Sequence, residues 1–293
     1  AGATPAIAGD KPLYEAAPSW VEDRPAQSSK EKSTGPFQWM DQQARIERGQ
    51  LWTYTEFAFA LDTPDALTQL GTISAEWLPD KGDLIVHRAQ LERGSETIDL
   101  LAAGQTFEIL RREQALESRM LNGALTATMP VSGARVGDVL RVAYTVTRSD
   151  QAMGDDVQWQ ANLLAKPFPL GSGRVIASWP ADLPVSHASV AVKDLAEPQV
   201  AGNFTRWEAA MPLAVRDPVP GDAPMRFQLG PMLQVSTFAD WESVSRSMAR
   251  HYRVEGAIAP GSALAGEVNR IAAASDDPLV RAMAEAAGCR IVT

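Results

Sequence analysis

Apolar and polar residues alternate along three blocks in the first half of the chain, as they do on half-buried β-strands. The blocks cover residues 84–101, 107–130 and 134–146. Gly94, Gly123 and Gly137 stand where the chain would have to reverse or bulge, and glycine adopts positive φ without steric cost. We expect the three blocks to be neighbours in one sheet.

Strand patterns also precede these blocks. Residues 50–61 are rich in aromatic residues and threonine, which favours a strand. Residues 62–64 provide a cap and a first-turn proline for a short helix through Leu70. Residues 73–77 alternate on the next strand, and the turn-like residues 79–83 lead into the first block. We expect four or five strands to follow one another as an antiparallel meander.

After Tyr144 the alternation is interrupted by polar residues and then resumes. Further strands are predicted at residues 158–164, 173–179, 185–192, 203–209 and 233–236. Residues 212–224 contain four prolines and cannot form a central strand, since proline donates no hydrogen bond to a sheet. From residue 237 the apolar period becomes that of helices.

Three helices are predicted in this last part. Thr237 and Asp240 have the spacing of a capping box at the start of the first helix. Its apolar face is formed by Trp241, Val244, Met248 and Tyr252. The second helix carries Leu264, Val268 and Ile271 on one face. Asp277 and Pro278 are a favoured cap and first-turn pair for the third.

These patterns divide the chain into three parts. Residues 1–36 carry scattered prolines and a polar run, which predicts an extended leader whose apolar pairs, Leu13-Tyr14 and Trp20-Val21, dock as an arm on the main body. Residues 37–235 form a mainly β domain, a large antiparallel sandwich or saddle. Residues 236–293 form a short α-helical segment.

Five short motifs within the alternating blocks carry a family resemblance. They comprise His87 with Arg93-Gly94 and Ile98–Leu101, then Arg111–Glu113, Asn122–Thr126 and Arg135–Leu140. In this order and spacing they resemble the N-terminal β domain of unknown function that precedes transglutaminase-like (papain-like thiol) cores in bacterial exported proteins. The resemblance implies a fold similar to the N-terminal β domain of some aminopeptidases, export to the periplasm, and a core that follows the helices.

Charge and composition narrow the functional classes. The formal net charge of -9 argues against binding to nucleic acid or anionic lipid, since both need a dense positive field. No run approaches the roughly 18 apolar residues of a membrane span. A single cysteine excludes an internal disulfide. The small residues at the start are typical of a chain whose signal peptide has been removed.

Cys289 is the one candidate for a thiol nucleophile. It lies near the C-terminal end of a predicted helix, where the helix dipole opposes a thiolate. The resembling family has its nucleophile in a Gly-Asp-Cys context, whereas Ala287 and Gly288 precede the cysteine here. We therefore favour a structural role for Cys289 and expect no catalytic residue, no metal site and no cofactor in this chain.

The other candidates for chemistry have simpler interpretations. His87, His187 and His251 lack the close spacing of zinc ligands, and His87 is expected to be a hydrogen-bonded histidine at the edge of a core, in the same strand parity as Ile85, Ala89 and Leu91. The acid pairs Glu22-Asp23, Asp155-Asp156 and Asp276-Asp277 are expected to be solvated. Gly171 and Gly173 lack the rest of a phosphate-binding signature. Asn203-Phe204-Thr205 is a weak glycosylation pattern.

Tryptophans offer a different function. Five of the eight fall on predicted strands, at Trp52, Trp77, Trp159, Trp179 and Trp207. An exposed row of them would stack on sugar rings, whereas buried ones would fill the core. We favour the core.

The functional prediction is a non-catalytic exported domain that positions, or recognises protein or peptide for, an attached thiol-enzyme core. Its partners would be that C-terminal core and a protein or peptide. The alternatives are a module that binds cell-wall glycan through exposed tryptophans and an enzyme that uses Cys289.

Overall fold

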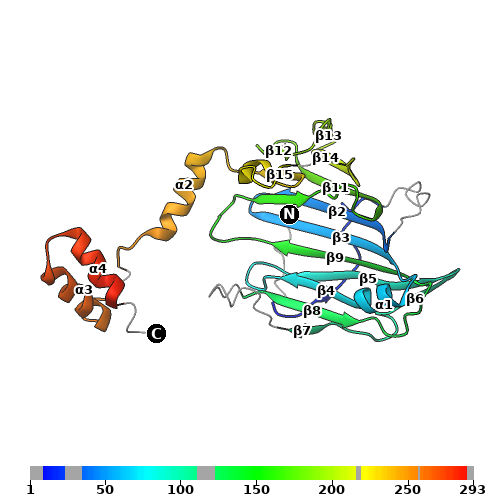
Figure 1. The fold of residues 1–293 in the computed structure, drawn as a ribbon, viewed down its shortest axis with the longest axis horizontal. Helices are drawn as coiled ribbons and strands as arrows, with labels where there is room; N and C mark the ends of the chain where they lie inside the picture. The colour runs from blue at the N-terminus through cyan, green and yellow to red at the C-terminus, as the bar shows by residue number, and fades with distance from the viewer. Residues whose placement is uncertain (1–8, 24–34, 111–122, 216–218, 257, 289–293) are drawn as a thin grey trace. The chain divides into compact units, whose positions relative to one another are not determined.

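The computed structural model describes residues 9–23, 35–110, 123–215, 219–256 and 258–288. The chain divides into two compact units, residues 1–243 and 244–293 (Figure 1). Most of the regular secondary structure in the described residues is strand, so the predicted mainly-β class with a short helical C-terminal segment is confirmed.

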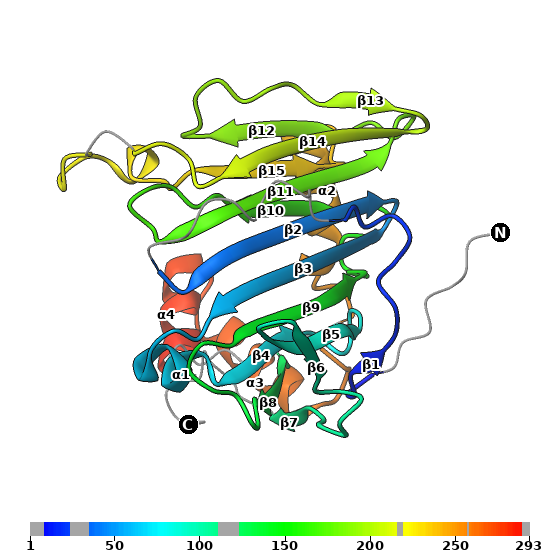
Figure 2. The same cartoon turned by 90° about the vertical axis from the view of Figure 1, so that its right-hand side faces the viewer.

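The first unit is built on one nine-stranded sheet (Figure 2). Its strands lie in the order β1 (Leu13–Tyr14), β5 (Leu84–Arg93), β9 (Val139–Arg148), β3 (Gln50–Ala60), β2 (Phe37–Glu47), β11 (Leu170–Pro180), β14 (Phe204–Met211) and β13 (Gln199–Ala201), and β6 (Glu96–Asp99) pairs with β5. Most pairs are antiparallel, but β1 runs parallel to β5 and β2 runs parallel to β11. The sheet is therefore mixed, where the sequence predicted an antiparallel one.

Two three-stranded sheets complete this unit. One has the order β10 (Gln158–Asn162), β15 (Met232–Ser236) and β12 (Ser186–Val190). The other has the order β4 (Thr72–Trp77), β8 (Leu125–Pro130) and β7 (Glu108–Leu110). Each shares a buried apolar cluster with the large sheet, centred on Trp179 and Leu233 in one case and on Leu91 and Met129 in the other.

Both clusters lie on the same face of the large sheet. Leu51 belongs to the first cluster and Phe59 packs against the second, and the two residues stand at odd positions of the continuous strand β3, whose side chains alternate between faces. The small sheets thus cover one face of the large sheet. The opposite face carries the even-numbered residues of β3 and their neighbours, and we call it the polar face.

The predicted meander is wrong. Residues 125–130 do not join β5 and β9 in the large sheet but pair with β4, with Ala75 opposite Ala127 and Trp77 opposite Leu125. Alternation identifies the buried face of a strand, and it does not identify the strand's neighbour. The short helix α1 (Pro64–Leu70) is confirmed, including its cap: the Thr63 side chain accepts a hydrogen bond from the backbone N of Ala66.

The expected docking of Leu13 and Tyr14 is also confirmed. These two residues form β1 beside Ile85 and Val86 of β5. Trp77 Nε1 donates to the carbonyl of Gly9 at 3.3 Å. None of residues 9–23 is itself buried, so this N-terminal segment lies on the surface of the first unit.

The C-terminal segment forms α2 (Trp241–Ala249), the 3-10 helix η4 (Arg250–Tyr252), α3 (Ala263–Ala274) and α4 (Pro278–Gly288); a further 3-10 helix, η3 (Met225–Phe227), precedes β15. Asp277 caps α4 as predicted, since its Oδ1 accepts from the backbone N of Leu279 at 2.9 Å. The predicted role of Thr237 in a cap is wrong. Its Oγ1 accepts from the backbone N of Val157, and Asp240 caps α2 by accepting from the backbone N of Ser243.

Candidate functional site

Charged side chains form a row across the polar face, at right angles to the strands. Strand register places Arg174 opposite Asp41, Asp41 opposite Glu56, and Glu56 opposite Ala143, which lies opposite Arg88. Arg88 and Arg174 are thus separated by four strand-to-strand steps across five strands. Three of the charged residues, Asp41, Glu56 and Arg174, are buried, so the row is a structural part of the sheet.

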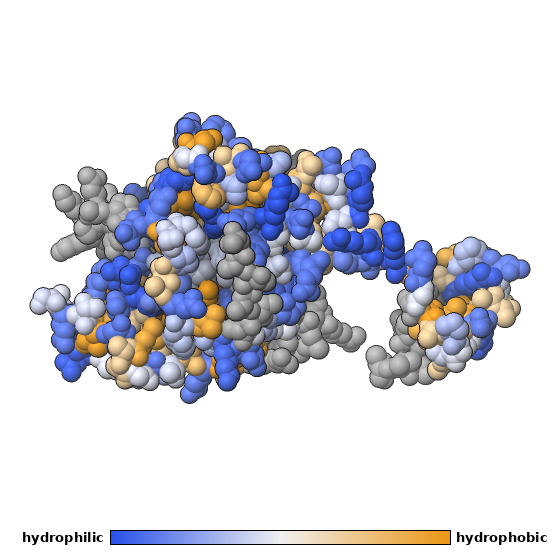
Figure 3. All heavy atoms as spheres, turned by 180° about the vertical axis from the view of Figure 1, so that it is seen from behind, coloured by the Kyte–Doolittle hydropathy of each residue, from blue (hydrophilic) through white to orange (hydrophobic). Residues whose placement is uncertain are grey.

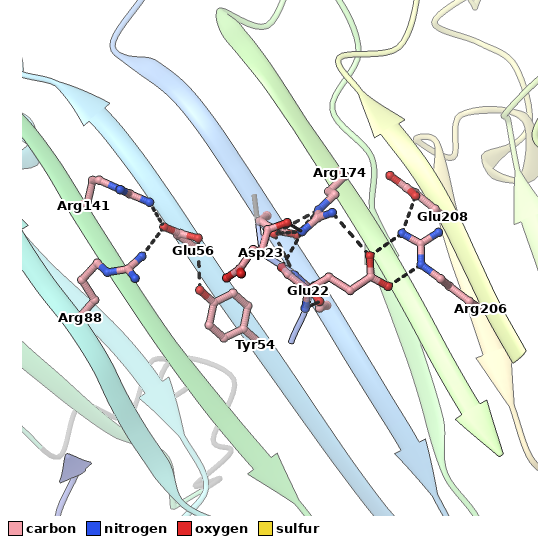
Figure 4. A network of polar contacts seen from close by, with 11 residues as sticks. Glu22, Asp23, Tyr54, Glu56, Arg88, Arg141, Arg174, Arg206 and Glu208 are labelled. Atoms are coloured by element: carbon pink, nitrogen blue, oxygen red, sulfur yellow. Dashed lines mark hydrogen bonds and ion pairs between the residues drawn. The ribbon is translucent and has the colours of Figure 1, made fainter. Parts of the chain in front are cut away.

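Glu56 is the centre of one half of the row (Figure 4). Its Oε1 accepts from Arg88 at 2.8 Å and from Arg141 at 2.6 Å, and its Oε2 accepts from the Tyr54 hydroxyl at 3.2 Å. Burial raises the pKa of Tyr54, with the neighbouring Glu56 charge acting in the same direction. Tyr54 therefore serves as a neutral hydrogen-bond donor to the carboxylate.

Asp41 and Arg174 form the other half. Arg174 Nη2 lies 2.8 Å from Asp41 Oδ2, and Nε lies 3.1 Å from Oδ1. Burial raises the pKa of Asp41, and hydrogen bonds from Arg174 and Gln43 act against that shift. The Asp41 carboxylate fixes the plane of the guanidinium, so that the remaining donors of Arg174 point away from the sheet.

The N-terminal segment takes up those donors. Arg174 Nη2 donates to the carbonyl oxygens of Glu22 at 2.7 Å and Asp23 at 3.0 Å. The Glu22 side chain reaches the next strand, where Arg206 Nε and Nη2 bind its two oxygens at 2.5 and 2.8 Å (Figure 4). The hydrogen bond from Arg206 lowers the pKa of Glu22. The polar face thus holds an extended segment by its backbone and by one carboxylate.

His87 lies between the N-terminal segment and the sheet. Its Nδ1 is 2.9 Å from the Glu15 carbonyl oxygen and its Nε2 is 2.7 Å from Thr145 Oγ1. Burial lowers its pKa. The expected hydrogen-bonded histidine is confirmed, but its expected parity is wrong, because a register shift between Val86 and Arg88 reverses the alternation of β5 at this residue.

The other histidines and acid pairs have local roles. His187 Nε2 lies 3.2 Å from Glu197, and His251 lies in η4, two residues after the end of α2. Four of the six acids in the predicted pairs have protein partners: Glu22 binds Arg206, Asp156 accepts from Thr237, Asp276 lies 3.2 Å from Arg281, and Asp277 caps α4. Asp156 is half-buried and the other five are exposed to solvent, as the sequence predicted.

Metal and thiol chemistry find no further support within the described residues. In these residues, no three His, Cys, Asp or Glu side chains gather where they could hold a metal ion. Cys289 lies outside the described residues. Gly173 is needed for strand contact, since a Cβ there would lie 2.6 Å from the carbonyl oxygen of Met40. In the part of the chain that is described, no helix is long and apolar enough to span a membrane.

Four of the five strand tryptophans are buried, as predicted: Trp77, Trp159, Trp179 and Trp207. They cannot form an exposed row. Trp52 is half-buried and lines a hollow of about 220 Å³ with Lys81, Asp83 and Arg148. A second hollow, of about 140 Å³, lies beside Glu22 and Arg206 on the polar face. The row, with the N-terminal segment bound to it, is therefore the candidate functional site.

The chemistry of this arrangement is that of binding. Glu56, Asp41 and Glu22 each pair with at least one arginine at 2.8 Å or less. Their oxygens already accept hydrogen bonds from arginine side chains of the sheet, and the hydrogen bond from Arg206 lowers the pKa of Glu22, which makes that carboxylate a poor base. The guanidinium groups are donors only. The row can therefore fix an extended peptide and its carboxylate in place.

Comparison with known protein families matches residues 47–212 to DUF3857, a domain of unknown function represented among solved structures. This is more than half of the chain. The chain belongs to the DUF3857 family. The predicted membership of a β domain of unknown function is confirmed, and the attached transglutaminase-like core stays a prediction. Among curated proteins, none matches the sequence significantly.

Solved structures resemble the DUF3857 chain at low identity. The crystal structure of a "putative protease" from Parabacteroides distasonis matches with a TM-score of 0.59 and 12% identity, over 80% of this chain and 45% of that one. An M1 zinc metallopeptidase from Deinococcus radiodurans matches at 0.31 and 15%, over 68% and 42%. Native yeast LTA4 hydrolase matches at 0.31 and 12%, over 75% and 32%.

The chain spans less than half the length of each of these structures. Identity of 12% in the first match shows a shared fold alone, and the TM-scores of the other two are too low to carry an argument. Within the chain, the DUF3857 region contains Glu56, Arg174 and Arg206, while Glu22 and Asp41 precede it. The N-terminal segment and β2 thus complete a polar face that the family region begins.

Proposed function

We propose that this chain is a non-catalytic, exported domain that positions a protein segment for an attached thiol-enzyme core of the transglutaminase-like type. The proposal rests on the large apolar side chains that are exposed on helices α2, α3 and α4. Among the described side chains of α2 and α3 none is buried. Large apolar side chains on these helices and on α4 are exposed, and an exposed apolar surface of this kind marks a site of protein interaction.

The exposed residues are large. Trp241 is 86% exposed, Leu279 69% and Met283 66%. Tyr252, Leu264 and Val268 are also exposed, and Figure 3 shows apolar side chains on the visible surface of the part of the helical segment that contains α3 and α4. The amphipathic pattern of α2 and α4 is that of helices that pack against a partner. An attached core is the partner that fits the family resemblance.

Two further observations support an enzyme partner and export. The Parabacteroides protein, which shares the fold of this chain, is named a putative protease and is more than twice as long as the matched part. The chain contains one cysteine, which is compatible with an oxidising compartment because no mispaired disulfide can form within it.

The test compares this chain with the complete product of its gene. If a thiol-enzyme core follows the helices, the downstream sequence contains a Gly-Asp-Cys motif, and amide hydrogen exchange in α3 and α4 is slower in the complete protein than in this chain. Strand β3, within the large sheet, serves as the internal control and exchanges alike in both. A complete protein without such a core, or equal exchange of α3 and α4, contradicts the proposal.

The glycan-binding alternative has less support. It needs tryptophans open to solvent on strands, and of the five candidates only Trp52 is not buried. Titration with wall glycans, followed by tryptophan fluorescence, separates the two functions. A saturable shift that is lost in Trp52→Ala would favour the glycan binder, and an unchanged spectrum would favour the positioning domain.

A further inference from the structure

Three side chains from three adjacent strands surround Glu22 of the N-terminal segment. They are Gln43 of β2, Arg174 of β11 and Arg206 of β14, and we call them the glutamate cradle. Gln43 is 2% exposed and Arg174 4%. Such buried polar groups are costly unless they are hydrogen-bonded. The hydrogen bonds that Gln43 and Arg174 form with residue 22 therefore offset the cost of burying these two side chains.

The cradle binds the backbone of residue 22 first. Gln43 Oε1 accepts from the backbone N of Glu22 at 2.9 Å, and its Nε2 donates to the carbonyl of Glu22 at 2.8 Å. The Gln43 amide thus pairs with residue 22 as a neighbouring β-strand would. Arg174 adds donors to the carbonyls of Glu22 and Asp23. These contacts suit any extended peptide, because they use only main-chain atoms.

The cradle then selects a carboxylate. Arg206 binds both oxygens of Glu22 in the fork geometry that a guanidinium offers to a carboxylate. Arg174 Nη1 lies 3.7 Å from Glu22 Oε2. Glu208 accepts from Arg206 at 2.6 Å and orients it. A glutamine at this position would meet two guanidinium groups with one acceptor and an unsuited NH₂ group.

The cradle residues Gln43 and Arg174 are also held by a contact within the sheet, to Asp41. Asp41 is fully buried and holds Arg174 by two oxygens. Gln43 Nε2 also donates to Asp41 Oδ2 at 2.9 Å. The N-terminal segment, in contrast, has no buried residue, and its hydrogen bonds at Glu22 are to side chains, with strand pairing confined to Leu13 and Tyr14. Its hold on the face rests on polar contacts that another peptide can reproduce.

We propose that the glutamate cradle is a recognition site for an extended peptide that carries a glutamate. The N-terminal segment occupies it within the same molecule, and a glutamate-bearing segment of a partner protein competes for it. Arg45 and Phe204 of the sheet line a hollow of about 140 Å³ that adjoins the cradle, and Trp20 of the N-terminal segment lines it from the other side, which is where a flanking side chain of another peptide would lie. The inference deepens the proposed function by naming the class of segment, while the binding step itself requires no attached core.

The experiment uses the full chain with a protease site engineered into residues 24–34. After cleavage the N-terminal fragment is held by contacts alone, and its high effective concentration as a tethered segment is removed. A fluorescein-labelled synthetic peptide of residues 18–23 is then titrated by anisotropy. A second peptide carries glutamine in place of Glu22. Circular dichroism before and after cleavage reports whether the fold persists.

The glutamate peptide is expected to displace the cleaved fragment, and the glutamine peptide to bind about two- to five-fold more weakly, as loss of a partly exposed carboxylate pair would cause. Arg206→Met removes the difference between the two peptides. Arg88→Met is the control, because Arg88 pairs with Glu56 on the same face and does not contact Glu22. This variant should keep the difference in affinity between the two peptides. Equal binding of the two peptides, or no displacement from a folded cleaved protein, overturns the inference.

This outcome is independent of the proposed function. The titration contains no enzyme core and measures no activity, so it can succeed when the hydrogen-exchange test of α3 and α4 fails. The reverse also holds. Slower exchange in the complete protein together with equal binding of both peptides would leave the positioning role standing and would remove its glutamate specificity.

Discussion

The two faces of the large sheet are made by the same strands and hold their partners by different means. On the covered face, side chains such as Trp179, Val175 and Leu140 are buried against the small sheets. On the polar face, Asp41, Gln43 and Arg174 are buried too, but their partner is a segment without any buried residue. Apolar burial is non-directional and large, whereas the polar face offers directed contacts of small net energy. We therefore expect the covered face to contribute more to stability than the polar face, and we propose the polar face as the one that binds a peptide.

The largest expected effect lies on the covered face. Trp179→Ala removes a side chain that is 4% exposed at the centre of an apolar cluster and should lower the free energy of unfolding by about 4 kcal/mol. Trp52→Ala, on the polar face of β3 and half-buried, should cost less than half as much. Urea denaturation followed by circular dichroism measures both. Equal losses would show that the two faces do not differ in their share of stability.

The next largest effect should come from the buried ion pair of the polar face. Arg174→Met leaves Asp41 without its cation in a buried position and should cost about 3 kcal/mol at neutral pH. Burial already raises the pKa of Asp41, so the folded variant binds a proton more readily than the unfolded chain. Its stability relative to the unaltered protein should therefore recover as the pH falls through that raised pKa.

The double variant Asp41→Asn with Arg174→Met is the control for this pair. Asparagine keeps an acceptor for Gln43 and carries no charge, so the double variant should be more stable than Arg174→Met alone at neutral pH. Urea midpoints of the two variants between pH 5 and 8 make the comparison. If the double variant were the less stable of the two, an uncompensated charge on Asp41 could not be the cause of the loss.

Acidification should weaken the binding of the Glu22 side chain to the cradle, because protonation removes its negative charge. Hydrogen bonding to Arg206 lowers the pKa of Glu22 below its ordinary 4.5. The contribution of Glu22 is therefore fully present above about pH 4.5 and is lost as the pH falls through the lowered value in the folded protein. Because the pair is partly exposed, Glu22→Gln should cost only about 0.5–1 kcal/mol at pH 7.

The measurement is the difference in unfolding free energy between the unaltered protein and Glu22→Gln as a function of pH. Other carboxylates, Asp138 and Asp150 among them, also have lowered pKa values, but they are common to both proteins and cancel in the difference. The difference should shrink toward zero below pH 4. A difference that stays constant from pH 7 to pH 3 would mean that Glu22 is not held as a carboxylate.

The sequence predicts which residues of many strands are buried on the covered face. It does not predict which strands pair with one another. Alternation marks Ile73, Ala75 and Trp77 as buried, and they are. The same alternation marks residues 125–130, yet nothing in it specifies that they pair with β4 and not with β5. Parallel pairing of β2 with β11 is equally hidden, because the two strands are separated by more than a hundred residues and alternation carries no record of direction.

The polar face was missed for a related reason. Asp41, Gln43 and Arg45 alternate along β2 and predict a strand face turned away from an apolar core. A single sequence does not show that Asp41 meets Arg174 across a separation of 133 residues. The alternation of these polar residues was the available signal, and it predicts side chains that face solvent. His87 was predicted to be hydrogen-bonded but was placed on the wrong parity, because a bulge leaves no periodic trace.

The smallest expected effect lies outside both faces, on α4. Leu279 is 69% exposed, so Leu279→Ser should change the free energy of unfolding of this chain by no more than about 0.5 kcal/mol. Leu233→Ser provides the matched contrast, since Leu233 is fully buried in β15 and its replacement should cost several times more. Urea denaturation of the two variants measures the ratio. A loss above about 2 kcal/mol for Leu279→Ser would mean that the apolar face of α4 already has its partner within this chain, and the proposal of an attached core would then lose the observation on which it depends.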